Sequence, residues 1–282
     1  MKRLRIKHIT GFTYGGDVTA SYNEARMLPV SFDGQFVIAS GVEIGPVNAH
    51  YLYLDYWGTR VAAFEVLTPH HELSITANSV VEVRVPQAQA GSGDWEGLVR
   101  ASRSGTATME QLAQTRLTAP PADVVDLAER VAAHHRDPSA AALAICTAVG
   151  EALEYVPGVT SVHSSGADAW AHRKGVCQDI AHVALGALRS VGIPARYVSG
   201  YLHPIEDAEI GETVSGESHA WVEWFSPSGW RGFDPTNGIE IGDRHVLVGR
   251  GRDYDDVPPL RGVYAGSFGS TLFVSVEITR EA

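Results

Sequence analysis

The segment Gly175-Val176-Cys177-Gln178-Asp179-Ile180-Ala181-His182 decides how the second half of this chain folds. Gly175 is a natural break and an apolar run of helical length continues to Leu188, so the pattern predicts a helix that begins near Cys177. The amino terminus of a helix carries N–H groups without intrahelical partners and the positive end of the macrodipole, which together favour an anion. The position therefore favours the nucleophilic thiolate form of a cysteine. Asp179, in the first turn, is interpreted as structural support.

Two later segments carry candidate partners for this thiol. Ser218–Phe225 alternates as a strand that contains His219, and Trp230–Asp234 is predicted as the return strand after a turn cluster. If the whole cluster forms the loop, Asp234 lies opposite Trp221, whereas a tighter loop places it opposite His219. In both registers His219 and Asp234 share one face of the sheet, as direct or diagonal neighbours about 4.5–8 Å apart.

Cysteine, histidine and aspartate in this order form a candidate catalytic triad. Each residue alone has a more ordinary explanation, because a free cysteine is most often a buried apolar residue and an aspartate before proline most often forms a turn. Three such coincidences in compatible local structure are less expected than one site. The other cysteine, Cys146, lies in an apolar helical stretch with no break before it and is predicted to be structural.

The remaining pattern predicts an α+β protein. Aromatic and β-branched runs dominate the first 85 residues, and helical apolar spacing appears at 123–135 and 139–153. The last segment, 271–279, alternates as a strand and is expected to return to the amino-terminal sheet. We predict a β-rich amino-terminal domain at 1–90, a linker at 91–120, a catalytic core of helices followed by an antiparallel sheet at 121–250, and a carboxy-terminal segment at 251–282.

Composition and charge exclude several classes of function. The 282 residues include 33 acidic and 22 basic side chains, and the net charge of −11 argues against non-specific nucleic-acid binding. No stretch approaches the roughly 18 apolar residues of a membrane span, and no signal-peptide core follows the basic start. Two cysteines do not make a disulfide framework. We therefore expect a cytoplasmic protein without a membrane partner.

The twelve histidines invite a metal interpretation. Two pairs are adjacent in the sequence, His70-His71 and His134-His135. Neighbouring residues point in different directions and lack the i, i+4 geometry of a helical metal site. We expect neither a metal nor a cofactor.

Several blocks resemble one family. Three of them are similar to the core of bacterial transglutaminase-like proteins: Gly175–Tyr201, Ser218–Glu223 and Gly232–Gly238. Four more resemble the flanking segments of that family: His8–Tyr14, Tyr22–Pro29, Asp55–Thr59 and Gly251–Gly262. The resemblance aligns Cys177 with the nucleophile, His219 with the base and Asp234 with the third member. It implies a papain-like core that acts on amide bonds of a protein or peptide substrate. Unlike animal transglutaminases, the chain shows no run of acidic residues resembling a calcium loop.

The oxyanion hole of such a site needs two donors. The backbone N–H of Cys177 is one candidate. The indole N–H of Trp170 is another, although packing beneath the helix is the commoner role for an aromatic residue at that place. We expect a cysteine-dependent amide or isopeptide hydrolase or acyl transferase that works through a thioester, with hydrolysis favoured. The alternative is a catalytically silent binding module on the same fold.

Overall fold

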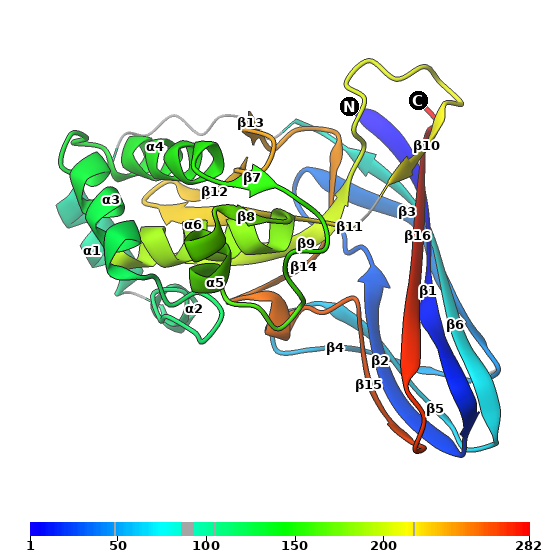
Figure 1. The fold of residues 1–282 in the computed structure, drawn as a ribbon. Helices are drawn as coiled ribbons and strands as arrows, with labels where there is room; N and C mark the ends of the chain where they lie inside the picture. Colours follow the sequence, from blue (N-terminus) through cyan, green and yellow to red (C-terminus); the bar gives the residue numbers. More distant parts are fainter. Residues whose placement is uncertain (48, 86–92, 104, 217) are drawn as a thin grey trace.

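The computed structural model describes residues 1–47, 49–85, 93–103, 105–216 and 218–282. Its helices gather on one side of the molecule and its longest strands on the other (Figure 1). All three of its larger sheets are antiparallel. The predicted α+β class is thereby confirmed. The predicted boundary near residue 90 lies outside the described residues.

Two antiparallel sheets form the amino-terminal part. Inward side chains from both, among them Met27, Phe64, Leu73 and Ile75, make one buried cluster, as strand alternation requires. The first sheet has the order β10-β16-β1-β6-β3 and the second the order β15-β2-β5-β4. The strands of the first sheet are β1 (Lys2–Val18), β3 (Gln35–Gly45), β6 (His70–Val83), β10 (Thr213–Gly216) and β16 (Ser270–Arg280). The strands of the second are β2 (Ala20–Leu28), β4 (Tyr51–Leu54), β5 (Arg60–Val66) and β15 (Leu260–Ala265).

The end of the chain completes both of these sheets. The strand expected at 271–279 is β16, which pairs antiparallel with β1 from Leu4↔Arg280 to Tyr14↔Ser270, and the two run side by side in Figure 1. The strand before it, β15, pairs with β2. The amino-terminal domain is therefore built from both ends of the chain.

The core of the chain packs helices on a third sheet of order β13-β12-β11-β9-β14. The central helix of this core, α6, buries Ile180, Val183 and Leu185 against residues of the sheet that include Tyr197 and Val222. The helices are α3 (Ala122–Ala132), α4 (Pro138–Glu151), α5 (Gly166–His172), α6 (Cys177–Ser190) and the short η1 (Tyr254–Asp256). The strands are β9 (Ala195–Leu202), β11 (Ser218–Ser226), β12 (Gly229–Asp234), β13 (Ile239–Glu240) and β14 (His245–Gly251), with β7 (Glu154–Tyr155) and β8 (Lys174–Gly175) as a separate parallel pair.

The segment 91–120, predicted as a linker, is folded onto the core where it is described. It carries α1 (Trp95–Ser102) and α2 (Thr106–Glu110), and Leu98 is fully buried in the core cluster. The buried guanidinium of Arg189 donates to the carbonyl oxygen of Gln111 at 3.1 Å and to Thr118 Oγ1 at 3.0 Å. The small residues of this stretch suggested a linker, but a few buried anchors are enough to dock it.

A shared apolar cluster joins the core sheet to the amino-terminal domain. Leu4 and Ile6 on β1 and Ile278 on β16 pack with Tyr201 and Val246 of the core sheet. Within the described parts of the chain, no helix is long and apolar enough to cross a membrane.

Candidate active site

Cys177 is the first residue of α6. Its side chain is partly exposed, whereas Cys146 is buried. The carboxylate of Asp179 accepts the N–H of Val176 at 2.8 Å and the hydroxyl of Thr160 at 2.7 Å, so it caps the amino terminus of the helix. Burial raises the pKa of Asp179. The position of Asp179 agrees with the supporting role expected for it.

Glycine is required just before the cysteine. A Cβ atom on Gly175 would lie 2.7 Å from Asp179 Cβ and 2.8 Å from its Oδ2. The natural break read from the sequence is thus also a close approach to the helix cap.

The hairpin of β11 and β12 brings His219 to Asp234. Phe225 pairs with Trp230, as expected for the four-residue loop, but Ser226 also pairs with Gly229, so the turn itself contains only two residues. This register makes Asp234 a diagonal neighbour of His219. The imidazole donates from Nε2 to Asp234 Oδ2 at 2.7 Å. Because Nε2 is engaged, Nδ1 is the ring nitrogen left to face Cys177.

Asp234 is held by a tight turn at the end of β12. Its side chain is fully buried, and Oδ1 accepts the backbone N–H of Thr236 at 3.0 Å and of Asn237 at 3.2 Å. The side-chain amide of Asn237 donates to Oδ2 at 2.7 Å. These donors satisfy a buried charge that would otherwise be costly.

The electrostatics favour a charged histidine beside the thiol. Burial by itself lowers the pKa of His219, but the hydrogen bonds to Asp234 and to Cys177 outweigh it and raise the pKa to about 10. Burial also opposes ionisation of Asp234, yet the hydrogen bond from His219, the positive charge of that ring and the nearby His245 hold the pKa of that carboxyl well below its usual range. The three predicted residues are therefore brought together, with His219 in contact with both of the others.

Trp170 is not the oxyanion donor that its indole suggested. Its Nε1 donates to Asp123 Oδ2 at 2.6 Å, and the ring is buried in the core with the guanidinium of Arg173 stacked 3.6 Å from its centroid. The packing role was the correct alternative. The backbone N–H of Cys177, at the start of a helix, remains a candidate donor because the first N–H groups of a helix have no intrahelical partner.

Two residues that support the site were missed in the sequence. Asn237 follows Asp234 in the turn, and its place in an Asp-Pro-Thr-Asn segment typical of turns could have indicated it. His245 lies on β14 with its Nε2 3.5 Å from Asp234 Oδ2. Nothing in its local sequence marks it, because only the pairing of β14 with β9 brings it near the aspartate.

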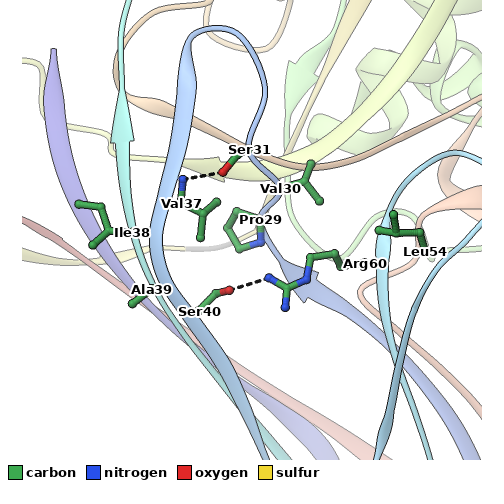
Figure 2. Close-up of a pocket in the computed structure, with 9 residues that line it drawn as sticks. All are labelled: Pro29, Val30, Ser31, Val37, Ile38, Ala39, Ser40, Leu54 and Arg60. Atoms are coloured by element: carbon green, nitrogen blue, oxygen red, sulfur yellow. Dashed lines mark hydrogen bonds between the residues drawn. The ribbon is translucent and has the colours of Figure 1, made fainter.

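Two cavities lie away from these residues. One, of about 330 Å³, is lined by the Pro29–Ser31 loop, β3 and Arg60, whose Nη1 donates to Ser40 Oγ at 2.7 Å (Figure 2). A hollow of about 990 Å³ lies over the second sheet. Within the described residues, neither is lined by Cys177 or His219. The same residues contain no group of three His, Cys, Asp or Glu side chains placed to hold a metal ion.

Known proteins share both parts of this architecture. The model of the transglutaminase-like superfamily matches residues 125–235, and that of the bacterial transglutaminase-like N-terminal region matches residues 4–82. Protein ML0607 of Mycobacterium leprae is 45% identical over 283 residues, covering 100% of both chains. The chain belongs to the transglutaminase-like superfamily.

A solved structure and a curated protein are also similar to this transglutaminase-like protein. A crystal structure from Cytophaga hutchinsonii, described as a candidate cysteine protease, has a TM-score of 0.79 at 20% identity and covers 100% of this chain and 92% of that one. This similarity shows a common fold. The protein-glutamine gamma-glutamyltransferase of Pseudomonas aeruginosa is 37% identical over 101 residues, which are 32% of this chain and 15% of that protein. The superfamily match at 125–235 contains Cys177, His219 and Asp234.

Proposed function

We propose that this transglutaminase-like protein is a cysteine-dependent enzyme that cleaves or transfers the acyl group of amide or isopeptide bonds in a protein or peptide. One observation carries the proposal. His219 donates a hydrogen bond to the buried carboxylate of Asp234 at 2.7 Å and also contacts Cys177 at the start of α6. A nucleophile, a base and a group that orients the base are the parts of thiol catalysis.

The first half of the reaction forms a thioester. The Cys177 thiolate attacks the carbonyl carbon, a C–S bond forms, and the carbonyl oxygen becomes an oxyanion that the Cys177 N–H is placed to receive. As the tetrahedral intermediate breaks down, the C–N bond is cleaved and the His219 imidazolium gives its proton to the leaving nitrogen. Asp234 stays ionised throughout and orients the ring.

The second half releases the acyl group. Neutral His219 takes a proton from water or from a second amine as that nucleophile attacks the thioester, and the C–S bond breaks to restore the thiolate. Water gives a free acid and an amine gives a new amide. We favour hydrolysis, because transfer needs a second site that shields the thioester from water.

The test uses an unfolded protein with accessible glutamine side chains, a labelled primary amine, and mass spectrometry of the products. We expect release of ammonia and free acid, with an acyl-enzyme detected on wild type and absent from Cys177→Ala, while Cys146→Ala behaves as wild type. Amine incorporation without free acid would make the protein a transferase. Neither product, with no acyl-enzyme from a panel of amide and isopeptide substrates, would favour the silent binding module.

A further inference from the structure

The amino-terminal domain hydrogen-bonds to β14, the strand that carries His245 beside the candidate active site. Gln35, the first residue of β3, donates from Nε2 to the carbonyl oxygen of Leu247 at 2.8 Å and accepts the N–H of Leu247 at Oε1, also at 2.8 Å. The same Nε2 donates to the carbonyl oxygen of Val30 at 2.8 Å. Because β14 is an edge strand of the core sheet, its outer backbone groups need such partners. Gln35 supplies them at Leu247.

His245 stands two residues before Leu247 on β14. Side chains two apart on a strand share a face, and both residues are only 3% exposed. The Nδ1 of His245 accepts the backbone N–H of Gly242 at 3.2 Å, so the neutral ring carries its hydrogen on Nε2. That Nε2 lies 3.5 Å from Asp234 Oδ2 and has no hydrogen-bond partner within normal distance among the described residues.

Trp221 links the two histidine rings. Its ring centroid lies 5.3 Å from that of His245 in an edge-to-face arrangement and 6.2 Å from that of His219. Trp221 also belongs to a small cluster with Leu247, against which Val30 of the amino-terminal domain packs. The amino-terminal domain thus contacts β14 in two ways: Gln35 bonds to the backbone of Leu247, and Val30 packs against the Trp221–Leu247 cluster.

We propose that His245 is a positioning residue for the Asp234–His219 pair, and that the amino-terminal domain sets its place through Gln35. The inference rests on the proposed function. The Nε2 of His245 is the second histidine nitrogen beside the Asp234 oxygen to which His219 donates, and a donor at that place limits rotation of the carboxylate. A separation of 3.5 Å is longer than a full hydrogen bond, and catalytic contacts in a free enzyme often tighten only when substrate binds.

The surroundings keep His245 neutral. The titratable and charged groups that act on it are Asp234, His219 and Arg244. Burial is the largest influence and lowers the pKa of His245, the charges of His219 and Arg244 act the same way, and the contact with Asp234 opposes them without reversing the shift. A neutral donor is what the proposed role requires.

The test measures the rate of Cys177 alkylation by iodoacetamide from pH 5 to 10, with the Cys146→Ala substitution in every protein. His245→Phe keeps an aromatic ring but has no donor, whereas His245→Gln places an amide N–H near the position of Nε2. We expect His245→Phe to slow alkylation at pH 6.5 roughly two- to threefold, because a contact of 3.5 Å contributes less than a full hydrogen bond, and to move the inflection toward that of a free thiol. His245→Gln should restore part of the rate.

A second arm tests the route through the amino-terminal domain. Gln35→Met keeps the length of the side chain and removes its hydrogen bonds. If Gln35 acts through His245, the double variant Gln35→Met/His245→Phe should be no slower than His245→Phe alone, because residues on one path are not additive. Urea unfolding of each variant separates this effect from lost stability, and Gln35→Asn, which keeps the amide on a shorter side chain, provides a second, milder change if Gln35→Met does not fold.

Each result bears on the inference. A normal pH profile for folded His245→Phe would overturn the positioning role, and additive rates in the double variant would overturn the route through Gln35. A wild type without any fast alkylation at pH 6–7 would overturn the proposed function together with this inference. If wild type shows the fast reaction and His245→Phe retains it, the inference alone fails.

Discussion

His219 donates to Asp234 across a diagonal of the β11–β12 hairpin, with Nε2 and Oδ2 2.7 Å apart. The hairpin ladder is last paired at Val222↔Phe233, and the next residue is Asp234. Its full burial places the negative charge where water screens it little. The same charge thus orients the imidazole and keeps it protonated beside Cys177.

Replacing the carboxylate should weaken both effects. In Asp234→Asn an amide replaces a charge that accepts from both His219 and Asn237, and kcat/KM should fall about 10²–10⁴-fold. The protonated form of His219 is lost as pH rises through its pKa of about 10, so the alkaline limb of activity should move to lower pH in the variant. A pH series of kcat/KM, with the exposed Asp33→Asn as control, checks this. An unchanged alkaline limb would show that Asp234 does not set the charge of His219.

The helix cap before the cysteine makes a second prediction. Gly175→Ala would place a methyl group 2.8 Å from the Asp179 carboxylate oxygen, so the cap must shift and unfolding should require about 1–3 kcal/mol less. Cys177 alkylation should slow with it. Gly41→Ala is the matched control, because a Cβ there meets nothing within 4 Å. Equal urea midpoints for the two variants would contradict the close packing of this cap.

Much of the core could be predicted from local sequence. The break at Gly175 and the start of the helix at Cys177 depend on neighbouring residues, and the structure has them where they are expected. The turn lies within the expected cluster but is shorter, because Ser226 and Gly229 pair. Such features are set by backbone conformation and short-range hydrogen bonds.

The remaining parts depend on tertiary contacts that no local pattern reports. No neighbour of Trp170 in the sequence indicates a partner for its indole N–H, because that partner, Asp123, lies on another helix. The segment with Leu98 has the composition of a linker, although it docks on the core. His245 reaches the aspartate only through the order of the sheet. The absence of a cofactor, the substrate and a cytoplasmic location stay predictions.

Buried histidines should make the fold sensitive to acid. Burial lowers the pKa of His8 to about 4, and burial together with the charge of Arg189 lowers that of His182 to about 3. Below pH 6.5 the unfolded chain therefore binds more protons than the folded one. The contribution of these neutral histidines to stability is complete above pH 6.5. As the pH falls toward 4, the free energy of unfolding should decrease by up to about 1.4 kcal/mol per pH unit for each histidine.

Substitution isolates one of these contributions. His8→Asn retains a donor for the Tyr201 hydroxyl, which His8 Nδ1 contacts at 2.9 Å, and should flatten the fall in stability between pH 6.5 and 4. The exposed His50→Asn should leave the slope as in wild type. Urea unfolding at four pH values measures it, and identical slopes for His8→Asn and wild type would count against a buried neutral His8.

Shortening one buried side chain measures how firmly α1, in the segment predicted as a linker, packs on the core. Leu98→Ala removes a fully buried side chain and should lower the free energy of unfolding by about 2–5 kcal/mol. Its neighbour Val99 on the same helix is 43% exposed, and Val99→Ala should change stability by less than about 0.5 kcal/mol. A small effect of Leu98→Ala would restore the linker interpretation.

The most direct test of the account is the pH dependence of Cys177 alkylation by iodoacetamide in wild type and in His219→Ala. The account predicts a fast reaction at pH 6–7 that His219→Ala slows at least about tenfold. Only about 1% of a free thiol with a pKa near 8.5 is ionised two units lower, and the weaker nucleophilicity of an acidic thiolate offsets part of that hundredfold difference. Slow alkylation in both proteins, with one inflection near 8.5, would contradict an activated thiolate and with it the proposed catalytic function.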